Sequence, residues 1–281
     1  MTDNVWIAAG QAGLFTPKGE TLPRALLPDA SLLALGGGQL FCACREKGQV
    51  LNVHKSAWLP SAPGICAMCV SRDGRYLYQL SGDCDSLLCV DIEKAQPLFL
   101  NRCGCYPQSL HLHPVWPLLA AAAGATGEIL LFEAPGLKLT GAQRVPGVAS
   151  CAVFVPYGLV FLSAIEKGDV CTLLGMIRYG GASPEELAVF PGVPGSLLPL
   201  EDGTVMVSVS GALMRVALAP FRVLFSRYSD GLITGMACEK GHVLLCDSAA
   251  GQVALMGAGY PYPHRICYEG DALHALFGPQ V

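Results

Sequence analysis

The sequence is a succession of short apolar segments separated by turns, and this pattern recurs about every 40 residues. The segments are rich in Val, Leu, Ile, Cys and aromatic residues and are bounded by Gly, Pro, Asp and Asn, which is typical of β-strands. Helical periodicity is almost absent. The first segments of the repeats are 31–36, 65–70, 109–114, 150–155, 196–201, 232–237 and 272–277. The chain is therefore expected to be an all-β repeat protein.

The spacing continues across the two ends of the chain. After 272–277 the chain ends without a second strand, and 5–10 supplies one, followed by 12–17 and 22–28. In the other repeats the first strand is followed by a more apolar second strand, a third strand and a less regular fourth strand. Proline and charged residues in the fourth strand are typical of an exposed sheet edge. Seven units of four antiparallel strands predict a seven-bladed β-propeller, a single domain over 1–281, with one blade closed by the N- and C-terminal strands.

Composition excludes several classes of partner. Hydrophobic residues make up 52% of the chain, which is ample for a sizeable core. Charged residues make up 14%, and the net charge of -4 is spread without blocks, so no nucleic-acid partner is expected. No apolar stretch approaches the roughly 20 residues of a membrane span, so no membrane association is expected. The N-terminus lacks the pattern of a secretory signal, which predicts a cytoplasmic location.

Thirteen cysteines occur in the chain, most of them inside apolar strand segments where a free thiol packs as a small hydrophobic group. An odd number without a secretory signal predicts reduced thiols instead of a disulfide framework. The exception is the loop pair Cys103 and Cys105, where exposure and the adjacent Arg102 would favour a thiolate. A redox role for this pair remains an alternative.

One repeat resembles a known family. The segment "VSRDGRYLYQLSGDCDSLLCVDIEKAQPL" at 70–98 is similar to the repeat of YVTN and lactonase-like propellers, which runs Ser-Pro-Asp-Gly, two aromatic residues, a turn and a Val-Asp strand. The segments 113–133 and 159–174 are weaker copies. The sequence departs from the family at Arg72, where proline is usual. No Trp-Asp dipeptide occurs, which disfavours the neighbouring WD-repeat group.

The resemblance implies which face carries function. In such propellers the fourth-to-first and second-to-third connections gather on one face around the channel. Arg and Tyr on loops over a rigid scaffold are enriched among binding anchors. The predicted ligand-binding residues are Arg102, Tyr106, Arg227, Tyr228 and Asp230. Further polar residues of these loops are Asp83, Asp85, Glu166, Lys167, Asp169, Glu269 and Asp271. The alternative for each is a solvated turn residue.

The opposite face offers a competing surface. Its two long connections contain Tyr179, Tyr260 and Tyr262, which could form an aromatic contact patch for a partner protein. Charged residues near the channel mouth would instead suit a small polar ligand.

Histidines could also define a site. His111 and His274 occupy the same position of their first strands, three or four blades apart, so both could converge on one ligand or metal across the channel. His113 lies on the same strand face as His111 by the two-residue period. The alternative is that each is satisfied by a backbone carbonyl, and we expect no metal site.

A catalytic function has one candidate residue. The segment 164–190 is loosely similar to the Asn-Glu-Leu strand pair of phosphogluconolactonase-like propellers, which places Glu166 on their glutamate, but Ile165 replaces the preceding asparagine. No nucleophile elbow, phosphate loop or metal-ligand spacing occurs. The leading hypothesis is a non-catalytic propeller, without a cofactor, that binds a protein partner or a small polar ligand at the loop-rich channel face. The alternative is a lactonase-like hydrolase that uses Glu166 with nearby Arg or His residues.

Overall fold

The computed structural model describes residues 5–9, 14–15, 27, 29–44, 47–104, 106–181, 183–228, 231–247, 250–269 and 274–277. These residues form the strands β1 to β27, arranged as small antiparallel sheets. Within this part of the chain no helix is long and apolar enough to cross a membrane.

Six sheets have four strands each, and we call them blades 1 to 6 in chain order. Blade 1 consists of β3 (Ala30–Gly36), β4 (Gln39–Cys44), β5 (Gln49–Asn52) and β6 (Ala57–Leu59). Blade 2 consists of β7 (Ile65–Val70), β8 (Tyr76–Ser81), β9 (Ser86–Asp91) and β10 (Gln96–Arg102). Blade 3 consists of β11 (Pro107–Leu112), β12 (Leu118–Ala123), β13 (Glu128–Glu133) and β14 (Lys138–Arg144).

The second half of the chain repeats this order. Blade 4 consists of β15 (Val148–Val155), β16 (Gly158–Lys167), β17 (Asp169–Arg178) and β18 (Glu185–Pro191). Blade 5 consists of β19 (Pro194–Pro199), β20 (Val205–Val209), β21 (Ala212–Leu218) and β22 (Phe221–Tyr228). Blade 6 consists of β23 (Ile233–Glu239), β24 (His242–Asp247), β25 (Gln252–Gly257) and β26 (Pro263–Glu269).

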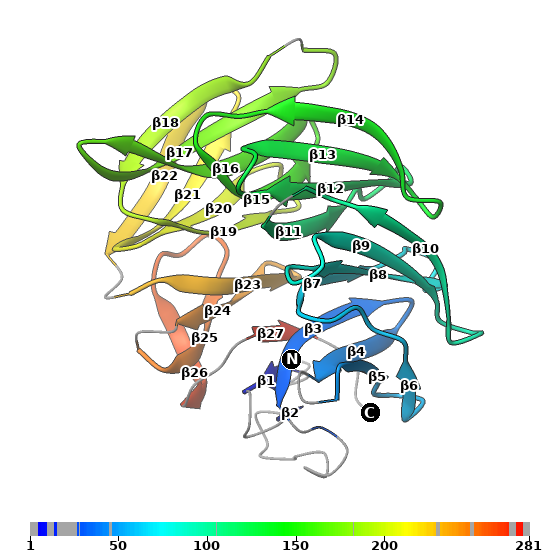
Figure 1. The fold of residues 1–281 in the computed structure, drawn as a ribbon. Helices are drawn as coiled ribbons and strands as arrows, with labels where there is room; N and C mark the ends of the chain where they lie inside the picture. Colours follow the sequence, from blue (N-terminus) through cyan, green and yellow to red (C-terminus); the bar gives the residue numbers. More distant parts are fainter. Residues whose placement is uncertain are drawn as a thin grey trace.

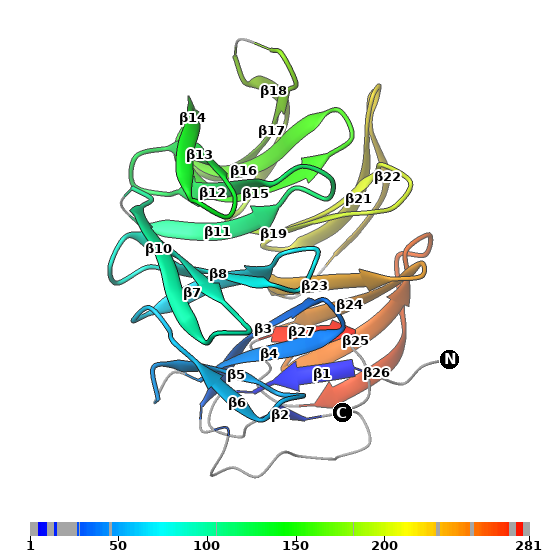
Figure 2. The ribbon, with the colours of Figure 1, turned by 90° about the vertical axis from the view of Figure 1, so that its right-hand side faces the viewer.

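The seventh sheet joins the two ends of the chain, and we call it the split blade. It contains β27 (His274–Phe277), β1 (Val5–Ala8) and β2 (Leu14–Phe15) in the order β2-β1-β27. Figures 1 and 2 show β27 and β1 between blade 6 and blade 1. The expected closure by both termini is thus confirmed with three strands. The fourth strand expected at 22–28 lies outside the described residues, except for Leu27.

The first strands form the inner ring of the molecule. Each contacts the first strand of the next blade, from β3 through β7, β11, β15, β19 and β23 to β27, which contacts β3 again. Because each sheet runs in order from its first to its fourth strand, β10, β14, β18 and β22 lie at the outside. The propeller fold predicted from the repeat is therefore confirmed.

The hydrophobic core is divided among the seams between sheets. Alternate residues of β1 show how this arises: Val5 and Ile7 pack against blade 6, while Trp6 and Ala8 pack against blade 1. Successive side chains of a strand point to opposite faces, and both faces of each blade are covered by a neighbour. This explains why the second strands read as continuous apolar runs, whereas the outer β10 is mostly exposed.

The antiparallel order gives the ring two faces. Face A carries the second-to-third connections within blades and the links from one blade to the next. Face B carries the first-to-second and third-to-fourth connections. The turn of blade 2 on face B has the chemistry expected from Asp73-Gly74: Gly74 has a φ of 71°, and its N–H donates to the Ser71 carbonyl at 2.9 Å.

Candidate functional site

Tyr106 lies on face A between blades 2 and 3, next to the innermost strand β11. Its N–H donates to the Asp85 carboxylate at 3.0 Å, and its carbonyl accepts the N–H of Gly124 at 2.8 Å. Its φ of 56° is uncommon for a residue with a side chain. A Cβ on Gly124 would lie 2.9 Å from the Tyr106 carbonyl oxygen, so the approach requires glycine. Two blades fix the Tyr106 backbone while 73% of the residue is exposed.

Arg102 and Cys103 precede Tyr106. Arg102 is the last residue of the outermost strand β10, so it lies toward the outer rim of face A. The exposure expected for Cys103 is wrong: the residue is buried, and burial raises the pKa of its thiol to about 12. A buried thiol with a raised pKa is not poised for redox chemistry. Its intended partner Cys105 lies outside the described residues.

Arg227 and Tyr228 are the last residues of β22, the outermost strand of blade 5. Tyr228 is 77% exposed. The Nε of Arg227 is buried and has no hydrogen-bond partner. Burial lowers the pKa of the guanidinium, and the negative charge of Asp247 opposes this shift. Among the described residues the Arg227 Nε therefore has no acceptor, and it lies several blades away from Tyr106 on face A. Asp230 lies outside the described residues.

Glu166 lies in the β16–β17 hairpin of face A and is exposed. Its neighbour Lys167 forms an ion pair with Glu186 at 3.9 Å. In the described part of the chain no hydrogen bond or ion pair joins Glu166 to an arginine or histidine. The arrangement expected for ring opening is thus not assembled around Glu166 by these residues.

His111 and His274 lie at different blade seams. Nδ1 of His111 accepts the N–H of Phe154 at 3.3 Å, which links blade 3 to blade 4. A bond to a backbone carbonyl would be donated by Nε2 and stays a prediction. His274 lies in the split blade beside Gly235 of blade 6, and its Nδ1 is buried with no hydrogen-bond partner among the residues that the structure describes. Among the described residues no cluster of three or more His, Cys, Asp or Glu side chains is placed to hold a metal ion.

The three tyrosines of face B do not form one patch. Tyr260 and Tyr262 are exposed and pack edge to face with ring centroids 5.9 Å apart. Tyr179 instead contacts His113 of blade 3 across the seam between blades 3 and 4. Only the first two tyrosines therefore remain as the predicted contact surface.

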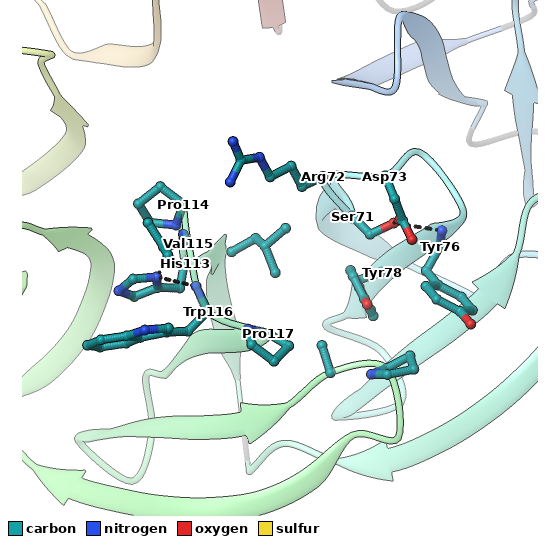
Figure 3. Close-up of a pocket in the computed structure, with 13 residues that line it drawn as sticks. Ser71, Arg72, Asp73, Tyr76, Tyr78, His113, Pro114, Val115, Trp116 and Pro117 are labelled. Carbon is teal, nitrogen blue, oxygen red and sulfur yellow. Dashed lines mark hydrogen bonds between the residues drawn. The ribbon is translucent and has the colours of Figure 1, made fainter.

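Face B also contains a cleft that the sequence did not predict. The cleft lies between blades 2 and 3, has a volume of about 410 Å³ and is lined by the connections 71–76 and 113–117 together with Ala134 and Pro135. Prolines, Val115 and the aromatic rings of Tyr78 and Trp116 supply most of its wall, as Figure 3 shows. It is the kind of concave, largely apolar site that binds small ligands.

His113 holds one wall of this cleft rigidly. Its Nδ1 accepts the N–H groups of Val115 at 3.0 Å and Trp116 at 2.9 Å. Nδ1 is therefore unprotonated, so the Nε2–H donates to Tyr179 Oη at 2.9 Å, and Tyr179 donates to the Val155 carbonyl at 3.3 Å. Burial lowers the pKa of His113, which agrees with the neutral ring. The connection that carries Trp116 is thus fixed in one conformation.

The sequence signal for the cleft is the run "HPVWP" at 113–117, in which two prolines and a tryptophan occupy a connection instead of polar turn residues. Val115 and Trp116 are both exposed, so this connection presents two neighbouring apolar side chains to solvent. The other wall comes from 71–78, and no sequence feature links the two segments before the blades are arranged.

Comparison with solved structures supports the fold. The chain is similar to Kuenenia stuttgartiensis hydrazine synthase, with a TM-score of 0.70, 14% identity, and coverage of 82% of this chain and 77% of that one. It is also similar to the β-propeller domain of Myceliophteria thermophila Cps50 (Swd1), with a TM-score of 0.69, 14% identity, and coverage of 94% and 88%. No protein-family profile and no curated protein sequence matches the chain. The protein is a β-propeller, and at this identity the likeness shows the fold alone.

Proposed function

We propose that the protein is a non-catalytic binding propeller that holds a partner protein on face A, with Tyr106 as an anchor. The observation that supports this is the combination of a backbone fixed by two blades with a side chain that is 73% exposed. A rigid, exposed tyrosine loses little conformational entropy on binding and buries a large amphipathic surface. The fold itself gives no reason for this residue to point into solvent at a φ of 56°.

Arg227 and Tyr228 are proposed as a second contact on the same face. The buried Nε of Arg227 cannot reach a partner, so this contact is made by the ring of Tyr228, which is 77% exposed at the end of β22. Because Tyr106 and Tyr228 belong to blades on different sides of the ring, a partner that contacts both has to extend across face A. This extent favours a protein over a small polar ligand.

The experiment compares proteins retained by immobilised wild-type protein and by variants. Tyr106→Ala is expected to reduce retention of a specific set of proteins at least about tenfold, the size typical of a hot-spot tyrosine. Tyr260→Ala is the matched control, since it removes an exposed tyrosine from face B. Depletion of the set by Tyr260→Ala but not by Tyr106→Ala would place the interaction on face B and refute the proposal.

The lactonase-like alternative rests on the sequence resemblance and on Glu166. An exposed carboxylate without a hydrogen-bonded arginine or histidine lacks the means to be tuned as a general acid or base. A panel of lactones separates the two functions. We expect no turnover above background; turnover that Glu166→Gln abolishes would establish the hydrolase in place of the binding function.

A further inference from the structure

The cleft of face B contains a cationic side chain, Arg72, that pairs with none of the described residues. Arg72 projects from the turn between β7 and β8 and extends across the cleft toward the side of Pro114, as Figure 3 shows. The Arg72 side chain is exposed, and no hydrogen bond or ion pair of the guanidinium occurs with any described residue. The next arginine, Arg75, is by contrast 3.7 Å from the Asp91 carboxylate.

Two other ionisable groups of the cleft, Asp73 and His113, are hydrogen-bonded within the protein. One oxygen of the Asp73 carboxylate accepts the Ser71 hydroxyl and the Arg75 N–H, and these bonds lower the pKa of Asp73. Both ring nitrogens of His113 are occupied within the protein. The Arg72 guanidinium is the cation among the residues that line the cleft, and a guanidinium recognises anions.

The apolar wall defines the rest of the ligand. Trp116 stacks on His113 with ring centroids 4.4 Å apart and meets Tyr179 edge to face at 5.3 Å, so its ring is fixed although 52% of the residue is exposed. Val115 and the prolines add further apolar surface. A volume of about 410 Å³ suits one ring or a branched chain with a short polar extension.

We propose that this cleft binds a small monocarboxylate with an aromatic or branched apolar body. The carboxylate pairs with Arg72 at the rim, and the apolar body packs on Trp116, Val115 and the prolines. The site lies on the opposite face from Tyr106, so it is independent of the proposed partner surface.

The test uses 3-phenylpropionate and its uncharged analogue 3-phenylpropanamide, which have nearly the same shape. Binding is followed by tryptophan fluorescence and by ligand-observed NMR at concentrations up to about 10 mM, since ligands of this size bind weakly. Trp116 is the tryptophan in the cleft; Trp6 is buried, and Trp58 lies in blade 1 beneath Lys47. Trp116→Phe should therefore remove the fluorescence change.

The acid is expected to bind about tenfold more tightly than the amide, the size of one charge-assisted hydrogen bond at a partly solvated rim. Arg72→Gln should abolish this preference. Arg222→Gln is the matched control, because it removes an exposed arginine from the outer strand β22 and should leave the preference intact. Equal affinity for acid and amide, no binding at 10 mM, or an unchanged preference in Arg72→Gln would each overturn the proposal.

Discussion

At the scale of single residues, two histidines make stability depend on pH. Burial lowers the pKa of His111 to about 4, with a contribution from nearby His113, and burial alone lowers that of His274 to about 4. Below the unfolded value near 6.5 the unfolded chain binds protons that the folded chain does not. The stability present at pH 7 is therefore lost progressively as the pH falls from about 6.5 toward 4.

We predict that the free energy of unfolding, measured with urea, falls by about 1–2 kcal/mol per histidine between pH 7 and pH 5. In His111→Asn the amide oxygen can still accept the Phe154 N–H but does not titrate in this range. The double variant His111→Asn, His274→Asn should lose the part of the pH dependence that these two groups cause, while His113, whose pKa burial also lowers, keeps its share. An unchanged pH dependence in that variant would show that other groups cause it.

At the scale of elements, β1 links the two ends of the ring. Ile7 is fully buried at the seam with blade 6. We predict that Ile7→Ala lowers the free energy of unfolding by about 2–4 kcal/mol, because it leaves a cavity in a packed seam. Ile266→Ala on the outer strand β26 is the matched control and should change the free energy of unfolding by less than about 1 kcal/mol.

A deletion tests the strand as a whole. Deleting residues 1–11 removes β1 and should cause aggregation or a large loss of stability.

A result in which the deleted protein stays monomeric and melts at its original temperature would contradict closure by β1. Equal effects of Ile7→Ala and Ile266→Ala would contradict the packing of Ile7 against blade 6. The two outcomes are separate, since the first tests the strand and the second tests its side-chain contacts.

The strands themselves were predictable because strands that are buried on both faces consist of continuous apolar residues. In blade 2 the predicted first strand 65–70 coincides with β7. In blade 4 the first strand is longer than the predicted 150–155: β15 begins at Val148, which is exposed. The 40-residue repeat therefore predicts where each strand lies. The exposed ends of a strand depend on hydrogen bonding to the neighbouring strand, which the residue types do not indicate.

At the scale of the whole molecule, a site was predictable only where one segment makes it. Tyr106 could be chosen from its own loop, although the bonds to Asp85 and Gly124 that fix it could not. The cleft joins Arg72 to Trp116, 44 positions later in the chain, through the packing of two blades. Side-chain exposure in connections likewise depends on neighbouring blades, which is why the sequence predicts an exposed thiol at Cys103, although this residue is buried.

The reactivity of the thiols tests which cysteine side chains are buried and which are exposed. The twelve described cysteines are all free thiols, and burial raises the pKa of several, including Cys66 to about 11 and Cys246 to about 12. Cys84 is exposed in the β8–β9 connection of face A. Because a disulfide reagent has to reach the sulfur, we predict that the exposed Cys84 reacts rapidly in the native protein and that the buried thiols react slowly.

Titration with the disulfide reagent at pH 8 measures how fast the native thiols react and how many thiols the protein contains. Cys84→Ser should remove one equivalent from the fast phase, whereas Cys103→Ser should leave that phase unchanged. After denaturation without reductant the total should approach thirteen, the number of cysteines in the chain. A fast phase that Cys84→Ser leaves intact would contradict the exposure of Cys84. A total lower by two, with Cys103 and Cys105 recovered in one linked peptide, would show that this pair forms a disulfide, which requires the Cys103 loop to open from its seam.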